Sequence, residues 1–136
     1  MINKKVVIED YSPTWASAFQ ELKSVYQRHL GDLITDIQHV GSTSVVGLPA
    51  KPVIDIDLIV MSNDTLDSIT EKLELLGYDR LGDLGISDRK AFKARSRQVP
   101  YEGSSRDWPK HHLYVCIADS YSFRNHIAFR DFLRNR

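Results

Sequence analysis

Two stretches of the chain repeat apolar residues every three or four positions, which is the spacing of an amphipathic helix. The first covers residues 13–30 and follows Ser12, a good N-cap residue, with Pro13 at the first helical position. The second covers residues 64–76 and ends before a glycine. A third stripe predicts a helix from about residue 120 to the end. Its inward side chains are expected to be Phe123, Ile127 and Phe132.

Short apolar runs of strand length lie between these helices and are bounded by turn residues. The helices come early, in the middle and late rather than after every strand, which favours an α+β fold over a doubly wound sheet. We therefore predict a single domain, residues 1–136, built as a mixed β-sheet with helices packed on one face. The expected strands are residues 6–8, 34–40, 53–60, 78–81, 90–97 and 111–117.

The composition is that of an ordinary globular domain. The chain of 136 residues is 42% hydrophobic, and its formal net charge is zero, so charge gives no reason to expect a nucleic-acid or membrane partner. No apolar run approaches the roughly 20 residues of a membrane span, and the first residues are too short for a signal peptide. We expect a cytoplasmic protein, in which the single cysteine, Cys116, is a small core residue.

The predicted strand at 53–60 is nearly all apolar apart from two aspartates, Asp55 and Asp57. Residues two apart in a strand point to the same face, so both carboxylates should face the same way. Two unpaired carboxylates in an apolar strand are costly to bury, and the usual partner of such a pair is a hard divalent cation. The pair therefore predicts a site for Mg²⁺ or Mn²⁺.

A Gly-Ser turn precedes this strand, with 12 residues between Ser42 and Asp55. Its residues, Gly41, Ser42, Thr43 and Ser44, could hold a phosphate through backbone N–H groups and a hydroxyl. The turn and the acidic pair together predict metal-assisted phosphate chemistry.

Several basic side chains could assist this chemistry or simply be solvated. Lys51, Arg89 and Lys93 could neutralise phosphates or be surface charges, and His39 could be a ligand or a hydrogen-bonded structural histidine. The arginines of the last helix are interpreted as a solvated face or a subunit contact. They include Arg124, Arg130 and Arg134.

The order of these features is similar to the signature of the DNA polymerase β-type nucleotidyltransferase superfamily. That signature is an apolar residue, Gly, then Gly or Ser, a spacer of this order, and Asp-apolar-Asp on the next strand. Nearly the whole chain more closely resembles the GrpB family. The segments that carry this resemblance are residues 11–15, 39–44, 47–52, 55–57, 77–78, 85–86 with Arg89, 110–113 and 126–133.

The resemblance implies that Ser42 contacts a phosphate and that Asp55 and Asp57 bind the metal. The implied activity is transfer of a nucleoside monophosphate from a nucleoside triphosphate to an unknown acceptor. The superfamily usually supplies a third acid from a later strand, but the predicted strand at 111–117 contains no carboxylate. Since GrpB-like chains use histidine there, His112 is a candidate catalytic residue, as a metal ligand or a proton shuttle.

Two other functions remain open at this point. One is a nucleotide- or coenzyme-binding module without turnover, since GrpB-like modules can occur fused to dephospho-coenzyme A kinase. The other is a metal-dependent phosphohydrolase, which would release inorganic phosphate instead of pyrophosphate.

Overall fold

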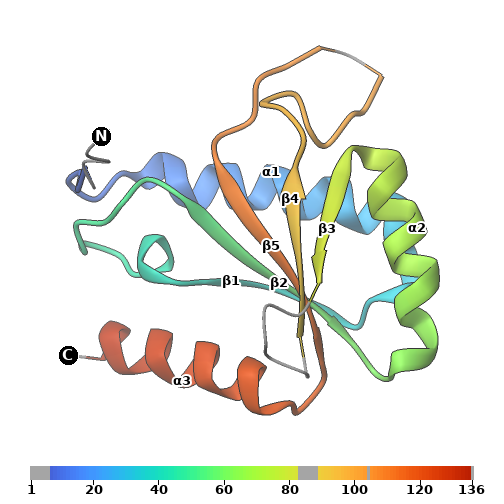
Figure 1. The fold of residues 1–136 in the computed structure, drawn as a ribbon. Coiled ribbons are helices and arrows are strands. Elements are labelled where there is room, and N and C mark those ends of the chain that lie inside the picture. The colour runs from blue at the N-terminus through green and yellow to red at the C-terminus, as the bar shows by residue number, and fades with distance from the viewer. Residues whose placement is uncertain (1–6, 83–88, 104, 136) are drawn as a thin grey trace, which may run out of the picture.

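The computed structural model describes residues 7–82, 89–103 and 105–135, which form a β-sheet flanked by three α-helices (Figure 1). The helices are α1 (Pro13–Leu30), α2 (Leu66–Leu76) and α3 (Tyr121–Arg134). The strands are β1 (Asp36–Val40), β2 (Ile54–Val60), β3 (Tyr78–Gly82), β4 (Arg89–Ala94) and β5 (His111–Ile117). Short 3₁₀ turns lie at η1 (Gly31–Leu33), η2 (Ser42–Ser44) and η3 (Asn63–Thr65).

The sheet is mixed, and its strand order is β1-β2-β5-β4-β3. The two central strands, β2 and β5, are parallel, while the other three pairs are antiparallel. This confirms the predicted α+β class and all three helices, with small shifts at the strand ends. The strand predicted at 6–8 lies partly outside the described residues, and the pairing beside it is a single bridge between Glu9 and Ala50.

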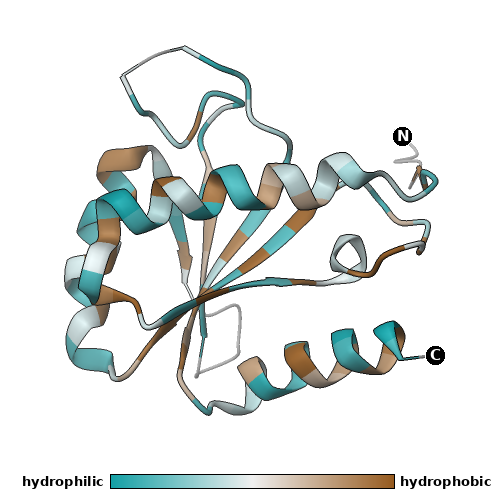
Figure 2. Cartoon of the chain, turned by 180° about the vertical axis from the view of Figure 1, so that it is seen from behind, coloured by the Kyte–Doolittle hydropathy of each residue, from teal (hydrophilic) through white to brown (hydrophobic). Residues whose placement is uncertain are grey.

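One face of the sheet carries the hydrophobic core. Alternate residues of β2 point toward α1 and α2 and are almost completely buried, as expected for a central strand. Figure 2 shows α1 crossing this face of the sheet. The β2 residues in the core are Ile54, Ile56, Leu58 and Val60.

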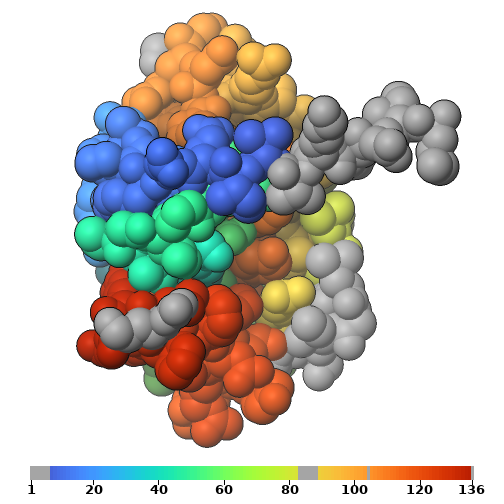
Figure 3. Space-filling model, turned by 90° about the vertical axis from the view of Figure 1, so that its left-hand side faces the viewer, coloured from blue at the N-terminus to red at the C-terminus, as the bar shows by residue number. Residues whose placement is uncertain are grey.

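The third helix lies on the opposite face of the sheet, so the predicted packing on one face holds for α1 and α2 only. Its His126, Arg130 and Arg134 are four residues apart and therefore share one side of the helix. All three hydrogen-bond to the rest of the protein: His126 to β2, Arg130 to β1 and Arg134 to the η2 turn. Figure 3 shows α3 directly below the segment that carries this turn.

The polar stripe formed by His126, Arg130 and Arg134 corrects two predictions about α3. Phe132 was expected inward, but it is 69% exposed. Arg130 and Arg134 were expected on a solvated face or a subunit contact. Arg130 is instead half-buried and donates to Gln38 Oε1 (2.8 Å), whereas Arg134 is exposed as expected but also donates to the Ser44 carbonyl (2.8 Å). Helical periodicity locates a stripe but not the face that contacts the protein, because a polar stripe can be buried where it finds hydrogen-bond partners.

A buried chain of hydrogen bonds links α1, β3 and β5 on the core side. The Tyr26 and Tyr78 hydroxyls are 2.8 Å apart, and Tyr78 Oη lies 2.7 Å from His111 Nε2. His111 Nδ1 donates to the Pro109 carbonyl (2.9 Å), so Nε2 of the neutral ring is the acceptor. Tyr78 therefore donates to His111 and accepts from Tyr26. Burial lowers the pKa of His111, which favours this neutral form.

Replacing Tyr78 by Phe should lower the free energy of unfolding by about 2–3 kcal/mol, because two buried polar groups lose their partners. Urea denaturation would measure the change. Tyr121→Phe is a suitable control, since Tyr121 is 70% exposed and its replacement should change stability by less than about 0.5 kcal/mol. Equal effects of the two substitutions would contradict the role given to the buried chain.

Candidate functional site

The two aspartates of β2 face the same side of the sheet, opposite the core, as their spacing predicted. In the parallel ladder, Asp55 lies beside His112 and Asp57 beside Tyr114. The environments of the two acids differ, because Asp57 is fully buried whereas the side chain of Asp55 is 29% exposed.

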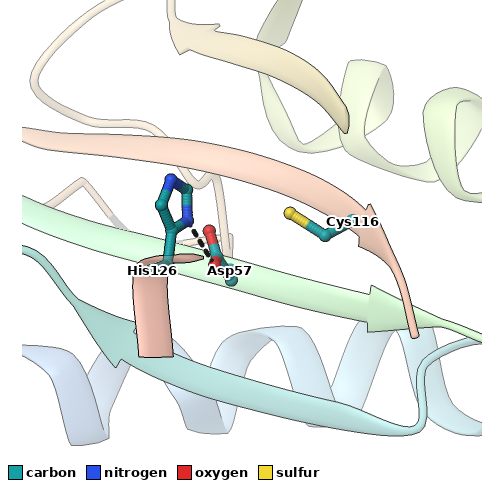
Figure 4. Close-up of side chains that lie close together, drawn as sticks. All are labelled: Asp57, Cys116 and His126. Atoms are coloured by element: carbon teal, nitrogen blue, oxygen red, sulfur yellow. Dashed lines mark hydrogen bonds and ion pairs between the residues drawn. The ribbon is translucent and has the colours of Figure 1, made fainter. Parts of the chain in front are cut away.

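Asp57 is held by a histidine from α3. His126 Nδ1 lies 2.7 Å from Asp57 Oδ2, whereas Oδ1 is buried and finds no hydrogen-bond partner in the part of the chain that the structure describes (Figure 4). Burial raises the pKa of Asp57, and the hydrogen bond from His126 opposes that rise. The sequence analysis did not select His126 as a site residue, although it begins the segment 126–133 that carries the family resemblance.

Asp55 lies between the Gly-Ser turn and β5. Its Oδ1 is 3.2 Å from His112 Nδ1. Gly41 has φ = 74° and ψ = −176°, a backbone region that is almost restricted to glycine. A Cβ atom there would collide with Asp55 Oδ2. The fold therefore brings together Gly41, Asp55 and His112, and glycine is needed because the carboxylate occupies the space of a side chain.

The other three turn residues are placed differently from one another. Ser42 is exposed, so its hydroxyl is free to meet a ligand. Thr43 is buried, and its hydroxyl donates to the Val53 carbonyl (3.0 Å). Ser44 donates to the Gly41 carbonyl (2.6 Å). The hydroxyls of Thr43 and Ser44 are thus hydrogen-bonded within the protein, because buried hydroxyls need internal acceptors, and phosphate binding by the turn stays a prediction.

Two roles were predicted for His39, a ligand or a hydrogen-bonded structural histidine, and the structure favours the second. Its side chain points to the core side, where it stacks on Phe19 with ring centroids 4.8 Å apart. Nε2 lies 3.0 Å from Thr43 Oγ1, which already donates to a carbonyl and therefore accepts from the ring. Burial, aided by the nearby Arg134, lowers the pKa of His39 from 6.5 to about 4.

This lowered pKa predicts a loss of stability in mild acid. Below pH 6.5 the unfolded chain protonates His39 while the folded protein does not, so stability is lost as the pH falls toward about 4. The loss in the free energy of unfolding that is due to His39 should reach about 3 kcal/mol. Urea denaturation should therefore show wild type losing this much relative to His39→Gln between pH 7 and pH 4. Equal pH profiles of wild type and His39→Gln would contradict the assignment.

The three predicted phosphate-binding cations are dispersed. Arg89 lies on the site face, with its guanidinium carbon 4.6 Å from the centroid of the Tyr114 ring; its Nε is buried and has no hydrogen-bond partner among the described residues. Lys93 is exposed on β4, farther along the same face. Lys51 is exposed in the segment before β2, and its phosphate role stays a prediction. The predicted resemblance at residues 85–86 lies outside the described residues.

The site face offers two overlapping sets of metal ligands. Asp55 with His112 and Asp57 with His126 put two carboxylates and two imidazoles on this face, donor types that suit Mn²⁺ and, through the carboxylates, Mg²⁺, although among the described residues Asp55 and His112 are not part of a compact group of ligand atoms. The unpartnered Asp57 Oδ1 is an oxygen that such an ion would satisfy. Asp57, His126 and Cys116 form the second set, with ligand atoms within 4.8 Å of one another (Figure 4). A thiolate would favour Zn²⁺ over Mg²⁺ there.

A family model described as GrpB protein matches residues 5–136. The chain belongs to the GrpB family. Over 131 residues, or 96% of this member, it is 32% identical to UPF0157 protein YqkA of Bacillus subtilis. The matched region is only 35% of that relative's length. The crystal structure of the conserved protein GrpB from Enterococcus faecalis superposes on 96% of this chain and 73% of its own, with a TM-score of 0.77 and 30% identity.

The fold also resembles that of Cid1, a poly(U) polymerase solved with the UTP analogue UMPNPP. That match covers 93% of this chain and 36% of Cid1, with a TM-score of 0.60 and 12% identity. The predicted nucleotidyltransferase-like fold is confirmed, and at this identity the likeness concerns the fold alone. None of the helices among the described residues is both long and apolar enough to cross a membrane.

Proposed function

We propose that this member of the GrpB family is a divalent-metal-dependent nucleotidyltransferase that moves a nucleoside monophosphate from a nucleoside triphosphate to an acceptor hydroxyl. The observation that carries the proposal is the close approach of Gly41 to Asp55, next to a buried Asp57 whose Oδ1 has no hydrogen-bond partner among the described residues. This close approach supports the proposal because the Gly-Ser turn lies beside a carboxylate of the pair on β2.

Asp55 and Asp57 would hold the metal, which when bound would neutralise the triphosphate and polarise the reacting phosphate. Ser42, exposed at the start of η2, would orient the phosphates through its amide and hydroxyl. Arg89 has an unpartnered Nε on the same face and would add positive charge. The protein therefore contributes mainly positioning and charge stabilisation.

His112 is proposed as the proton acceptor in place of a third carboxylate. Its Nδ1 faces Asp55 at 3.2 Å, which orients the ring and leaves Nε2 for the acceptor hydroxyl. As Nε2 takes the proton, the acceptor oxygen bonds to the α-phosphorus. The bond from that phosphorus to the oxygen bridging to the β-phosphate breaks, and pyrophosphate leaves.

A second candidate is a nucleotide- or coenzyme-binding module without turnover. The hydrogen bond between His126 and Asp57 favours it, because α3 then lies against one of the two acids. Binding without product would identify this function.

The test is to incubate the protein with each of the four nucleoside triphosphates and a mixture of candidate acceptors, with Mn²⁺, with Mg²⁺ and with a chelator. Pyrophosphate and inorganic phosphate are measured separately, and melting temperatures report binding. We expect pyrophosphate release that requires metal and is faster with Mn²⁺, since imidazoles join the carboxylates in the site. Release of inorganic phosphate alone would indicate a phosphohydrolase, and no metal-dependent binding or turnover would refute the proposal.

A further inference from the structure

A cavity lies where β4 and β5 separate. The two strands are paired from Arg89–Cys116 to Phe92–Leu113. Beyond this point β4 follows β3 while β5 follows β2, and residues 95–110 connect them (Figure 1). A cavity of about 620 Å³ occupies this region, which is within the range of small-molecule sites. Its lining includes Phe92, Lys93, Val99, Trp108, His112 and Tyr114.

The walls of the cavity are largely apolar and firmly held. Trp108 is only 5% exposed, and its indole nitrogen donates to the Pro100 carbonyl (3.0 Å). His111, also in the wall, is fixed by Tyr78 and by the Pro109 carbonyl. Wall side chains that are already held in place lose little conformational entropy when a ligand binds.

Three cations line the cavity: Lys93, Arg97 and Lys110. All three are exposed, and within the described part of the chain no carboxylate pairs with their side chains. By contrast, Arg28, Arg95 and Arg106 each contact an acid. The described lining contains no Asp or Glu, so the cavity has an excess of positive charge that an anionic ligand would balance.

His112 connects this cavity to the acidic site, because it lines the cavity and also contacts Asp55. We propose that the cavity binds the acceptor, an anionic organic molecule with an apolar or aromatic body that carries its reactive hydroxyl toward His112. The role as acceptor rests on the proposed function. The binding of an anionic apolar molecule rests only on the shape and charge of the cavity.

The binding test uses two molecules that share an aromatic body and differ in charge, 1-naphthyl phosphate and 1-naphthol, measured by titration calorimetry without metal. We expect the phosphate to bind at least about tenfold more tightly, and the Arg97→Gln/Lys110→Gln variant to lose at least about tenfold of that affinity. Lys72→Gln, at an exposed lysine of α2, is the matched control and should bind as wild type. Equal affinity for the two molecules, no binding, or an equal loss in the control would overturn the proposal.

A variant of the acidic site distinguishes a failure of the cavity proposal from a failure of the proposed function. Asp57→Asn should bind 1-naphthyl phosphate within about twofold of wild type, because its carboxylate lies outside the cavity lining. If transfer is absent in wild type but the charge-dependent binding is present, the nucleotidyltransferase proposal fails while the cavity site stands. If transfer occurs and remains unaffected by Arg97→Gln/Lys110→Gln for every anionic acceptor used, the acceptor role of the cavity is overturned.

Discussion

Replacing Asp57 by Asn is expected to abolish metal-dependent nucleotide turnover while leaving the protein folded. Loss of an outer-shell partner of a metal ligand typically costs 10–100-fold, so loss of a direct ligand should cost at least about 100-fold. The amide can still accept the hydrogen bond from His126, so α3 should remain in place. Pyrophosphate release with Mn²⁺ and a manganese titration would measure both effects.

The same variant should be at least as stable as wild type at neutral pH. Burial raises the pKa of Asp57, so the folded protein holds this proton more firmly than the unfolded chain does. Stability therefore falls as the pH rises from the unfolded value of 3.8 through the raised folded value, and Asn removes this loss. Asp32→Asn, at an exposed acid of η1, should leave turnover intact. Unchanged turnover in Asp57→Asn would remove this acid from the metal site.

Replacing Cys116 by Ser decides between the two metal arrangements. If Asp55 and Asp57 hold Mn²⁺, this substitution should change manganese affinity by less than about threefold, because a thiol is a poor ligand for that ion. If Asp57, His126 and Cys116 hold the metal, zinc affinity should fall by at least about tenfold instead. Parallel calorimetric titrations with the two ions distinguish these results. A large loss of manganese affinity would contradict the proposed ligands.

Replacing Gly41 by Ala is expected to have the second large effect, on both stability and metal binding. Its φ of 74° and ψ of −176° should cost a non-glycine residue about 1–3 kcal/mol. In addition, the new Cβ would meet Asp55 Oδ2, so the carboxylate must move out of its position against the turn. Urea denaturation and manganese titration should show lower stability together with at least about tenfold weaker binding.

Gly47→Ala separates backbone strain from the contact with Asp55. Gly47 also has a positive φ, 83°, but nothing lies within 4 Å of the Cβ that alanine would add. This control should lose stability without losing manganese affinity. If both variants lose stability but bind manganese as wild type does, the close approach of Gly41 to Asp55 has no role in the site.

The sequence alone was enough to predict the fold class, the three helices and the common face of Asp55 and Asp57. These features depend on local periodicity and on end signals such as Ser12-Pro13, which act between residues close in the chain. The family resemblance likewise indicated the GrpB family, and it selected His112, which the structure places 3.2 Å from Asp55 and whose catalytic role stays a prediction.

Only the tertiary structure decided which side chains meet at the site. His126 reaches Asp57 across 69 positions of the chain, and Arg134 reaches Ser44 across 90. Such contacts depend on which stripe of α3 faces the sheet, and here polar residues face it because hydrogen-bond partners are available there. The same packing assigns Thr43, Ser44 and His39 to internal hydrogen bonds. A residue pattern shows what a side chain can do, whereas its partners in the fold determine what remains free to bind a ligand.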